Sequence, residues 1–246
     1  MLKDHLLYWF HHLFRPESLE NKEWLMWKLL NDDRKFHGLK SLAMQNDLRL
    51  VARAHSNQMA EQDFFAHVDP QNRDPGDRIR GAGITDVAFG ENLAKMRGFD
   101  DVTEEAEKAL MKSPGHRANI LTASFNCVGV GVIKAKDETF YFTQNFARRF
   151  LRLNTRKKYY KCNRPLIFWP STLETFSQMA LQEKYEKPFS FHYTVQGNKV
   201  RLELTLLERG RYEFEILVQP MDEKKYYISN VLHLRAYSNI FDRFLV

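Results

Sequence analysis

The chain has 246 residues, of which 43% are hydrophobic, and it carries 37 Lys and Arg against 31 Asp and Glu. This length and apolar content suit one or two packed domains. Two cysteines are too few for a disulfide scaffold, and no apolar run approaches the roughly 18 residues of a membrane span. These properties exclude a small disulfide-stapled fold, and no segment is long and apolar enough to be predicted as a membrane-spanning helix.

The first residues give little sign of targeting. Residues 6–10 form a short apolar patch, but His11 and His12 interrupt it and no small-residue cleavage site follows. This pattern is a poor signal peptide. The sequence leaves open a mature secreted form and a protein that stays inside the cell.

Three helices are predicted in the first half of the chain. The first spans about residues 17–37, has Trp24 and Trp27 on its packing side and stops at Gly38. The second spans about 46–63 and places His55 on its apolar face, where a buried, hydrogen-bonded histidine is expected. Residues 69–83 are expected to be a loop with a helical turn at 77–80, and a third helix follows at 100–112.

The segment 113–121 has the features of a helix start. Ser113 suits the N-cap because its hydroxyl can accept a backbone N–H, and Pro114 suits the first helical position. His116 then lies in the first turn, near the positive end of the helix dipole, which favours a neutral imidazole. After it, Val128, Val130 and Val132 alternate with glycines, which predicts a strand with close backbone approach, and a strand at 140–145 returns beside it.

The last third of the chain has a different pattern. Ser171 is a plausible N-cap for a helix at 172–186, and strands are predicted at 200–206 and 212–218 because apolar and polar residues alternate there. The step from Gly210 to Tyr212 resembles the tyrosine corner of immunoglobulin-like sandwiches. We therefore expect a small β-rich accessory domain here, with the immunoglobulin-like sandwich as its candidate type.

Four sequence segments, taken in order, resemble those of the CAP superfamily (cysteine-rich secretory, antigen-5 and pathogenesis-related proteins), in its bacterial, disulfide-poor SCP-like branch. They are residues 55–60 with 64–67, Gly-Glu-Asn-Leu-Ala at 90–94, residues 113–121, and 128–132 with 141–146. The resemblance implies an α+β fold, the CAP α-β-α sandwich. The expected organisation is an N-terminal extension at 1–20, a CAP domain at 21–148, a basic linker at 149–164 and a β-rich domain at 165–246.

The resemblance also implies a cleft that gathers histidines and acidic residues. His67 and His116 match the two family histidines, Glu91 matches the glutamate of the Gly-Glu-Asn-Leu-Ala motif, and Ser113 stands near the place where many eukaryotic members have a second glutamate. Leu110 replaces the usual tryptophan. Two imidazoles and a carboxylate could bind Zn²⁺. The same groups could instead form a structural polar network.

Three functions remain open at this point. The favoured one is a non-enzymatic extracellular or cell-envelope module that binds a small apolar ligand or a partner through this cleft, with or without Zn²⁺ at His67 and His116. The alternative is a metal-dependent hydrolase of peptide or cell-wall material, with Glu91 as the base and no other catalytic residue assigned. The third is an envelope adhesion protein that uses its basic C-terminal region.

The net positive charge belongs to residues 151–246, since basic and acidic residues balance in 1–150. The densest run of basic residues, within 148–164, is either a binding surface for an anionic cell-surface polymer or a solvated linker. No specific nucleic acid recognition is expected. The basic residues of this run are Arg148, Arg149, Arg152, Arg156, Lys157, Lys158, Lys161 and Arg164.

Cys127 and Cys162 could pair or remain two unrelated thiols.

Overall fold

The computed structural model describes residues 18–84, 88–153, 159–221 and 223–238. The chain divides into two compact units. One comprises Met1–Pro75 and Gly90–Phe146, and the other comprises Gly76–Phe89 and Ala147–Val246. Within the described ranges, no helix is long and apolar enough to cross a membrane. The N-terminal patch and three of the basic residues, Arg156, Lys157 and Lys158, lie outside the described residues.

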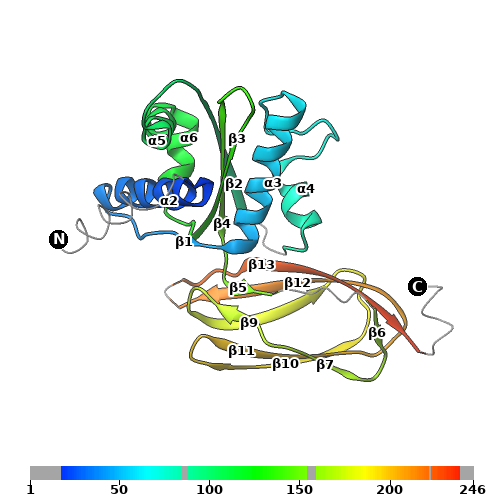
Figure 1. Ribbon diagram of the computed structural model, residues 1–246. Coiled ribbons are helices and arrows are strands. Elements are labelled where there is room, and N and C mark those ends of the chain that lie inside the picture. The colour runs from blue at the N-terminus through cyan, green and yellow to red at the C-terminus, as the bar shows by residue number, and fades with distance from the viewer. Residues whose placement is uncertain (1–17, 85–87, 154–158, 222, 239–246) are drawn as a thin grey trace. The chain divides into compact units, whose positions relative to one another are not determined.

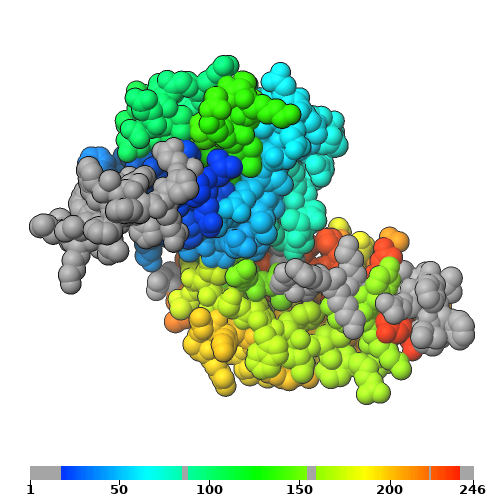
Figure 2. All heavy atoms as spheres, viewed as in Figure 1, coloured from blue at the N-terminus to red at the C-terminus, as the bar shows by residue number. Residues whose placement is uncertain are grey.

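The first unit is built on a four-stranded sheet in the order β1-β3-β4-β2. Its strands are β1 (Ala43–Met44), β2 (Ala88–Met96), β3 (Cys127–Lys134) and β4 (Phe140–Arg148). Helix α3 (Asn46–Gln62) covers one face, and α2 (Leu19–Phe36), α5 (Val102–Lys112) and α6 (Pro114–Ile120) cover the other (Figure 1). Helix α5 packs against both α2 and α6, and Figure 2 shows its green surface above the blue of α2. This three-layer arrangement confirms the expected α+β fold.

The two glycines of β3 allow α3 to lie directly on the sheet. A Cβ atom at Gly129 would stand 2.2 Å from the backbone nitrogen of Arg49, and one at Gly131 would stand 2.2 Å from that of Arg53. Both distances are far inside van der Waals contact, so any larger residue would push the helix away. The close backbone approach predicted from the alternating Val-Gly pattern is confirmed.

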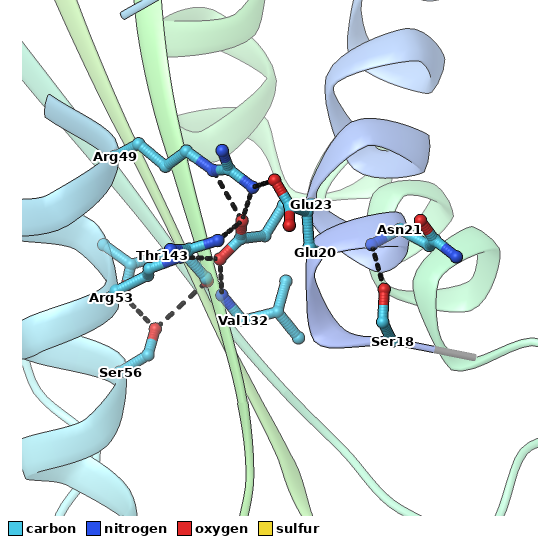
Figure 3. A network of polar contacts seen from close by, with 10 residues as sticks. Ser18, Glu20, Asn21, Glu23, Arg49, Arg53, Ser56, Val132 and Thr143 are labelled. Atoms are coloured by element: carbon cyan, nitrogen blue, oxygen red, sulfur yellow. Dashed lines mark hydrogen bonds and ion pairs between the residues drawn. The ribbon is translucent and has the colours of Figure 1, made fainter. Parts of the chain in front are cut away.

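Strand β1 pairs with only the first two residues of β3. Further along, a side chain covers the unpaired edge of β3 (Figure 3). Glu23 of α2 is fully buried, and its Oε1 accepts the backbone N–H of Val132 at 3.3 Å. The same carboxylate accepts hydrogen bonds from Arg49 Nε at 2.6 Å and from Arg53 Nη2 at 2.7 Å. A buried carboxylate is costly unless it is paired, and here two guanidinium groups of α3 compensate it. The network therefore joins both helices to the edge strand.

The predicted stop of the first helix at Gly38 is confirmed at the end of α2. Ser18 is its N-cap and accepts a hydrogen bond from the backbone nitrogen of Asn21 at 3.1 Å, and Gly38 has a φ of +73° just past the helix end. Trp27 packs on the core and donates from Nε1 to the Leu42 carbonyl at 2.8 Å, whereas Trp24 is 43% exposed. The helical turn expected at 77–80 is the short helix α4 (Pro75–Gly81).

The second unit contains a β-sandwich. One sheet has the order β10-β11-β8-β5, with β7 also paired to β11, and the other has the order β6-β13-β12-β9. Their residues bury a common apolar core. The strands are β5 (Leu151–Arg152), β6 (Tyr159–Lys161), β7 (Pro165–Phe168), β8 (Ser171–Thr172), β9 (Phe176–Glu183), β10 (Phe189–Gln196), β11 (Lys199–Leu206), β12 (Gly210–Pro220) and β13 (Tyr227–Tyr237).

The connections of this sandwich are immunoglobulin-like. The order β9-β12-β13 corresponds to strands C, F and G, and β10-β11-β7 corresponds to strands D, E and B. At the start of β12, the Tyr212 hydroxyl donates to the Glu208 carbonyl at 2.9 Å and accepts the Glu208 N–H at 3.0 Å. This is the geometry of a tyrosine corner, so the resemblance noted at Gly210–Tyr212 is borne out.

The helix predicted at 172–186 is wrong. Residues 171–172 form β8 and residues 176–183 form β9, which pairs antiparallel with β12 along its whole length. Gln, Met, Ala and Leu favour helix locally, but pairing to a central strand and burial of Met179 outweigh that propensity. Ser171 lies opposite Lys199 in the sheet and starts no helix.

The segment expected to be a basic linker supplies two short strands, β5 and β6, to the sandwich. The Arg149 side chain is buried. Arg148 is also largely buried, with its guanidinium 4.5 Å from the ring centroids of both Phe150 and Tyr227. Arg148 also pairs with Glu174 at 3.4 Å and Glu223 at 3.2 Å. Two members of the basic set therefore point inward, while Arg152, Lys161 and Arg164 are exposed.

No disulfide joins Cys127 and Cys162. Both residues are buried thiols, Cys127 in the core beside β1 and Cys162 in the core of the sandwich. Of the two alternatives left open by the sequence, two separate thiols are the one present.

Candidate functional site

The structure brings His67 and Glu91 together. His67 lies in the loop after α3, Glu91 lies on β2, and His67 Nδ1 is 2.9 Å from Glu91 Oε1. The glutamate side chain is 2% exposed and the histidine side chain is 51% exposed. A carboxylate can only accept, so Nδ1 carries the hydrogen and the imidazole is held in one orientation. Glu91 thus orients a histidine that faces the surface.

His116 lies in the first turn of α6 and interacts electrostatically with His67. Burial lowers the pKa of its imidazole from the usual 6.5, and the neighbouring His67 lowers it further. Both causes disfavour a positive charge on His116. The predicted neutral imidazole is therefore supported, but by burial and a neighbouring histidine more than by the helix dipole assumed from the sequence.

Ser113 occupies the N-cap position of α6 without capping the helix through its side chain. Its backbone is extended, Pro114 follows at the first helical position, and the serine side chain makes no capping hydrogen bond. The prediction of a hydroxyl cap is wrong: the Ser113 carbonyl accepts the Arg117 N–H at 2.9 Å, which is the ordinary first bond of a helix, and the hydroxyl takes no part in capping. Among the described residues, Ser113 shows no bond to His67, Glu91 or His116.

Two asparagines that sequence reasoning overlooked hold the site residues by their backbones. Asn92 Nδ2 donates to the His116 carbonyl at 3.0 Å, and Asn119 Nδ2 donates to the Glu91 carbonyl at 3.1 Å. Both lie inside the motifs that indicated the family, next to Glu91 and three residues after His116. Their place in these motifs is the signal that points to them, although neither amide titrates.

His55 has the structural role expected for it. It is fully buried, and its Nε2 is 3.1 Å from the Ala66 carbonyl in the loop that leads to His67. Its ring also meets Phe64 edge to face at 5.9 Å between centroids. His55 therefore supports the loop and takes no direct part in the site.

Exposed apolar side chains flank His67 in the chain. Phe65 is 46% exposed and Val68 is 48% exposed. The Phe65 ring lies 6.5 Å from the ring of Tyr141, which Lys95 approaches to 5.0 Å from the ring centroid. Exposed apolar side chains near oriented polar groups are typical of binding surfaces.

The residues give limited support for a metal centre. Within the ranges that the structure describes, no group of three or more His, Cys, Asp and Glu is arranged to hold a metal ion. A catalytic zinc site usually has three protein ligands. His67 and His116 could supply two at most, with Glu91 bonded to His67 as an orienting carboxylate. Zn²⁺ at this site stays a prediction.

The fold and this site define the first unit as a CAP domain. Residues 27–146 match the family described as "CAP: Cysteine-rich secretory protein family". This part of the chain belongs to that family, and the β-sandwich lies C-terminal to the matched residues.

Similar proteins occur in Bacillus. The chain is 37% identical over 120 residues to the uncharacterized protein YkwD of Bacillus subtilis (strain 168), covering 49% of this chain and 46% of YkwD. It is 29% identical over 147 residues to the uncharacterized membrane protein YlbC of the same organism, covering 56% of this chain and 40% of YlbC. The match thus spans less than half the length of each relative.

A solved structure of an extracellular protein containing an SCP domain from Bacillus anthracis str. Ames is also similar. It is 28% identical, with a TM-score of 0.48, and the match covers 55% of this chain and 44% of that one.

Proposed function

We propose that the CAP domain is a non-enzymatic binding module, whose surface around His67, Glu91 and His116 takes a small apolar ligand or the apolar part of a partner. The observation that carries the proposal is a half-exposed imidazole fixed at 2.9 Å by a buried carboxylate, with exposed Phe65 and Val68 on either side of it in the chain. Oriented polar groups beside apolar surface give a ligand both affinity and direction. A location outside the cell or at its envelope goes with the proposal and rests on the family's description as secretory.

The arrangement supports binding better than hydrolysis. Glu91 faces an imidazole and is nearly inaccessible to solvent, so it is poorly placed to take a proton from an attacking water. Ser113 has no base bonded to its hydroxyl among the described residues, which leaves no activated nucleophile. The imidazoles of His67 and His116 can hydrogen-bond a bound polar head group.

Binding of an apolar probe tests the proposal. We expect N-phenyl-1-naphthylamine fluorescence to show saturable binding to the full chain. Phe65→Ser should weaken this binding by about tenfold or more, since a buried phenyl contact contributes roughly 1.5–3 kcal/mol. Phe36→Ser is the matched control, because Phe36 is 85% exposed on α2. Equal effects of the two substitutions, or no saturable binding, would contradict the proposal.

Zn²⁺ titration tests the separate prediction that a metal is held by His67 and His116. Calorimetry of metal-free protein should show binding that His67→Ala or His116→Ala abolishes, and Glu91→Gln should weaken it roughly 10- to 100-fold. His192→Ala, an exposed histidine of β10, should change nothing. Binding that survives His116→Ala would remove the metal from this site.

A further inference from the structure

A buried glutamate outside the site, Glu107 of α5, is connected to it. Glu107 is 3% exposed, and burial raises the pKa of its carboxyl to about 8, with the charge on Asp33 of α2 adding to the effect. Its Oε2 accepts a hydrogen bond from Gln144 Nε2 at 2.7 Å, and its Oε1 has no hydrogen-bond partner among the described residues. Within the described part of the chain this carboxyl makes no ion pair, unlike that of Glu23.

Three side-chain amides lie between Glu107 and the site, and all donate in the same direction. Asn119 Nδ2 donates to Asn92 Oδ1 at 2.9 Å. Asn92 Nδ2 donates to Gln144 Oε1 at 3.0 Å, and Gln144 then donates to Glu107. We call Asn119, Asn92, Gln144 and Glu107 the amide relay. Asn92 and Gln144 are fully buried, so these groups cannot replace a lost partner with bulk water.

The relay ends on the backbone of the two site residues that it flanks. The same Nδ2 atoms of Asn92 and Asn119 also donate to the carbonyls of His116 and Glu91. These bonds form only while each amide nitrogen faces its carbonyl. If the Asn92 amide were reversed, its oxygen would face the carbonyl oxygen of His116, and its nitrogen would face the amide nitrogen of Asn119.

We propose that Glu107 is a positioning residue for the site, because its carboxyl oxygen terminates the amide relay and so keeps the amides of Gln144, Asn92 and Asn119 oriented toward His116 and Glu91. The inference rests on the proposed function only in taking His67, Glu91 and His116 as the working part of the site. It holds whatever the site binds.

Loss of the acceptor at position 107 has a defined consequence. Gln144 Nε2 would become a buried donor without a partner, and such a group costs more than the bond itself contributed. Rotation of the Gln144 amide would relieve it but would place a nitrogen against Asn92 Nδ2. The lost acceptor therefore also weakens the hydrogen bonds of the Asn92 amide, including its bond to the His116 carbonyl.

Three variants of the full chain test this without any ligand. Glu107→Leu removes the acceptor, Glu107→Gln keeps one oxygen in place, and Thr103→Val removes a buried hydroxyl one turn earlier on α5 that has no hydrogen-bond partner in the described structure. The readouts at one fixed, mildly acidic pH are the ring ¹H–¹³C shifts of His116, the side-chain amide signals of Asn92 and Asn119, and hydrogen exchange in α6.

Glu107→Leu should move all these signals and speed exchange of the α6 amides by about tenfold or more. Glu107→Gln should restore wild-type values, and Thr103→Val should leave them unchanged. A folded Glu107→Leu protein with wild-type signals, or a Gln variant as disturbed as the Leu variant, would overturn the proposal. If Glu107→Leu does not fold, Gln144→Met interrupts the relay one step later and must give the same shifts. Since no probe is added, failure of apolar binding leaves this result unaffected.

Discussion

Among the described residues of the first unit, three glutamates are buried, and each is stabilised by a different kind of partner. Glu23 lies between two guanidinium groups, Glu91 bonds an imidazole, and Glu107 meets only an amide. An amide can donate a hydrogen bond but cannot compensate a full negative charge in a dry environment. Glu107 is therefore the buried glutamate that takes up a proton in the folded state. This protonation makes the stability of the fold depend on pH.

The sign of this linkage follows from the pKa of Glu107, raised by burial to about 8 from 4.5. Between these values the folded state binds one proton more than the unfolded state, so stability falls as pH rises, by at most about 1.4 kcal/mol per pH unit. Below 4.5 both states are protonated, and the penalty disappears.

Glu107→Gln should therefore gain stability relative to wild type as pH rises, and the gain should level off near the folded pKa. Urea unfolding of both proteins across this range measures it. Glu104→Gln, a partly exposed position on the same helix, should show a flat difference. A flat difference for Glu107→Gln as well would mean that the carboxyl is ionised in the folded protein.

At the scale of secondary structure, most of the first unit was predictable from the sequence. The periodic apolar face of residues 46–63 became α3 at Asn46–Gln62, and the alternating valines and glycines became β3. His67, Glu91 and His116 were also predicted by their motifs, and the structure places them together. Such local patterns are sufficient because each carries its own periodicity or cap.

What could not be predicted depends on partners distant in the sequence. Residues 176–183 have helical composition, yet they form β9 because β12, some 35 residues later, offers a complete ladder. The role of Gln144 and Glu107 depends on a bond between β4 and α5, 37 residues apart. No spacing rule connects such positions, whereas a capping residue acts within one helical turn.

At the scale of the whole molecule, the described apolar residues form distinct cores. One is built from the two sheets of the sandwich and includes Tyr212, and another lies between the CAP sheet and α2, α5 and α6. A residue that supports only one core should affect the stability of that unit alone.

Gly131→Ala and Tyr212→Phe test this separation. The alanine Cβ would strike the α3 backbone, which should destabilise the CAP unit by about 1–3 kcal/mol or more, and the phenylalanine removes the tyrosine corner at a cost of about 1–3 kcal/mol to the sandwich. Hydrogen exchange with peptide resolution should place faster exchange in α3 and β3 for the first variant and in β11 and β12 for the second.

Gly115→Ala is the control for the first substitution, because a Cβ at Gly115 meets nothing within 4 Å. In a helix this exchange should be neutral or stabilise by up to about 1 kcal/mol. If Gly131→Ala or Tyr212→Phe instead loosens both units to the same extent, the two cores unfold as one cooperative structure. The effect of each substitution would then measure the stability of the whole chain and not that of its own unit.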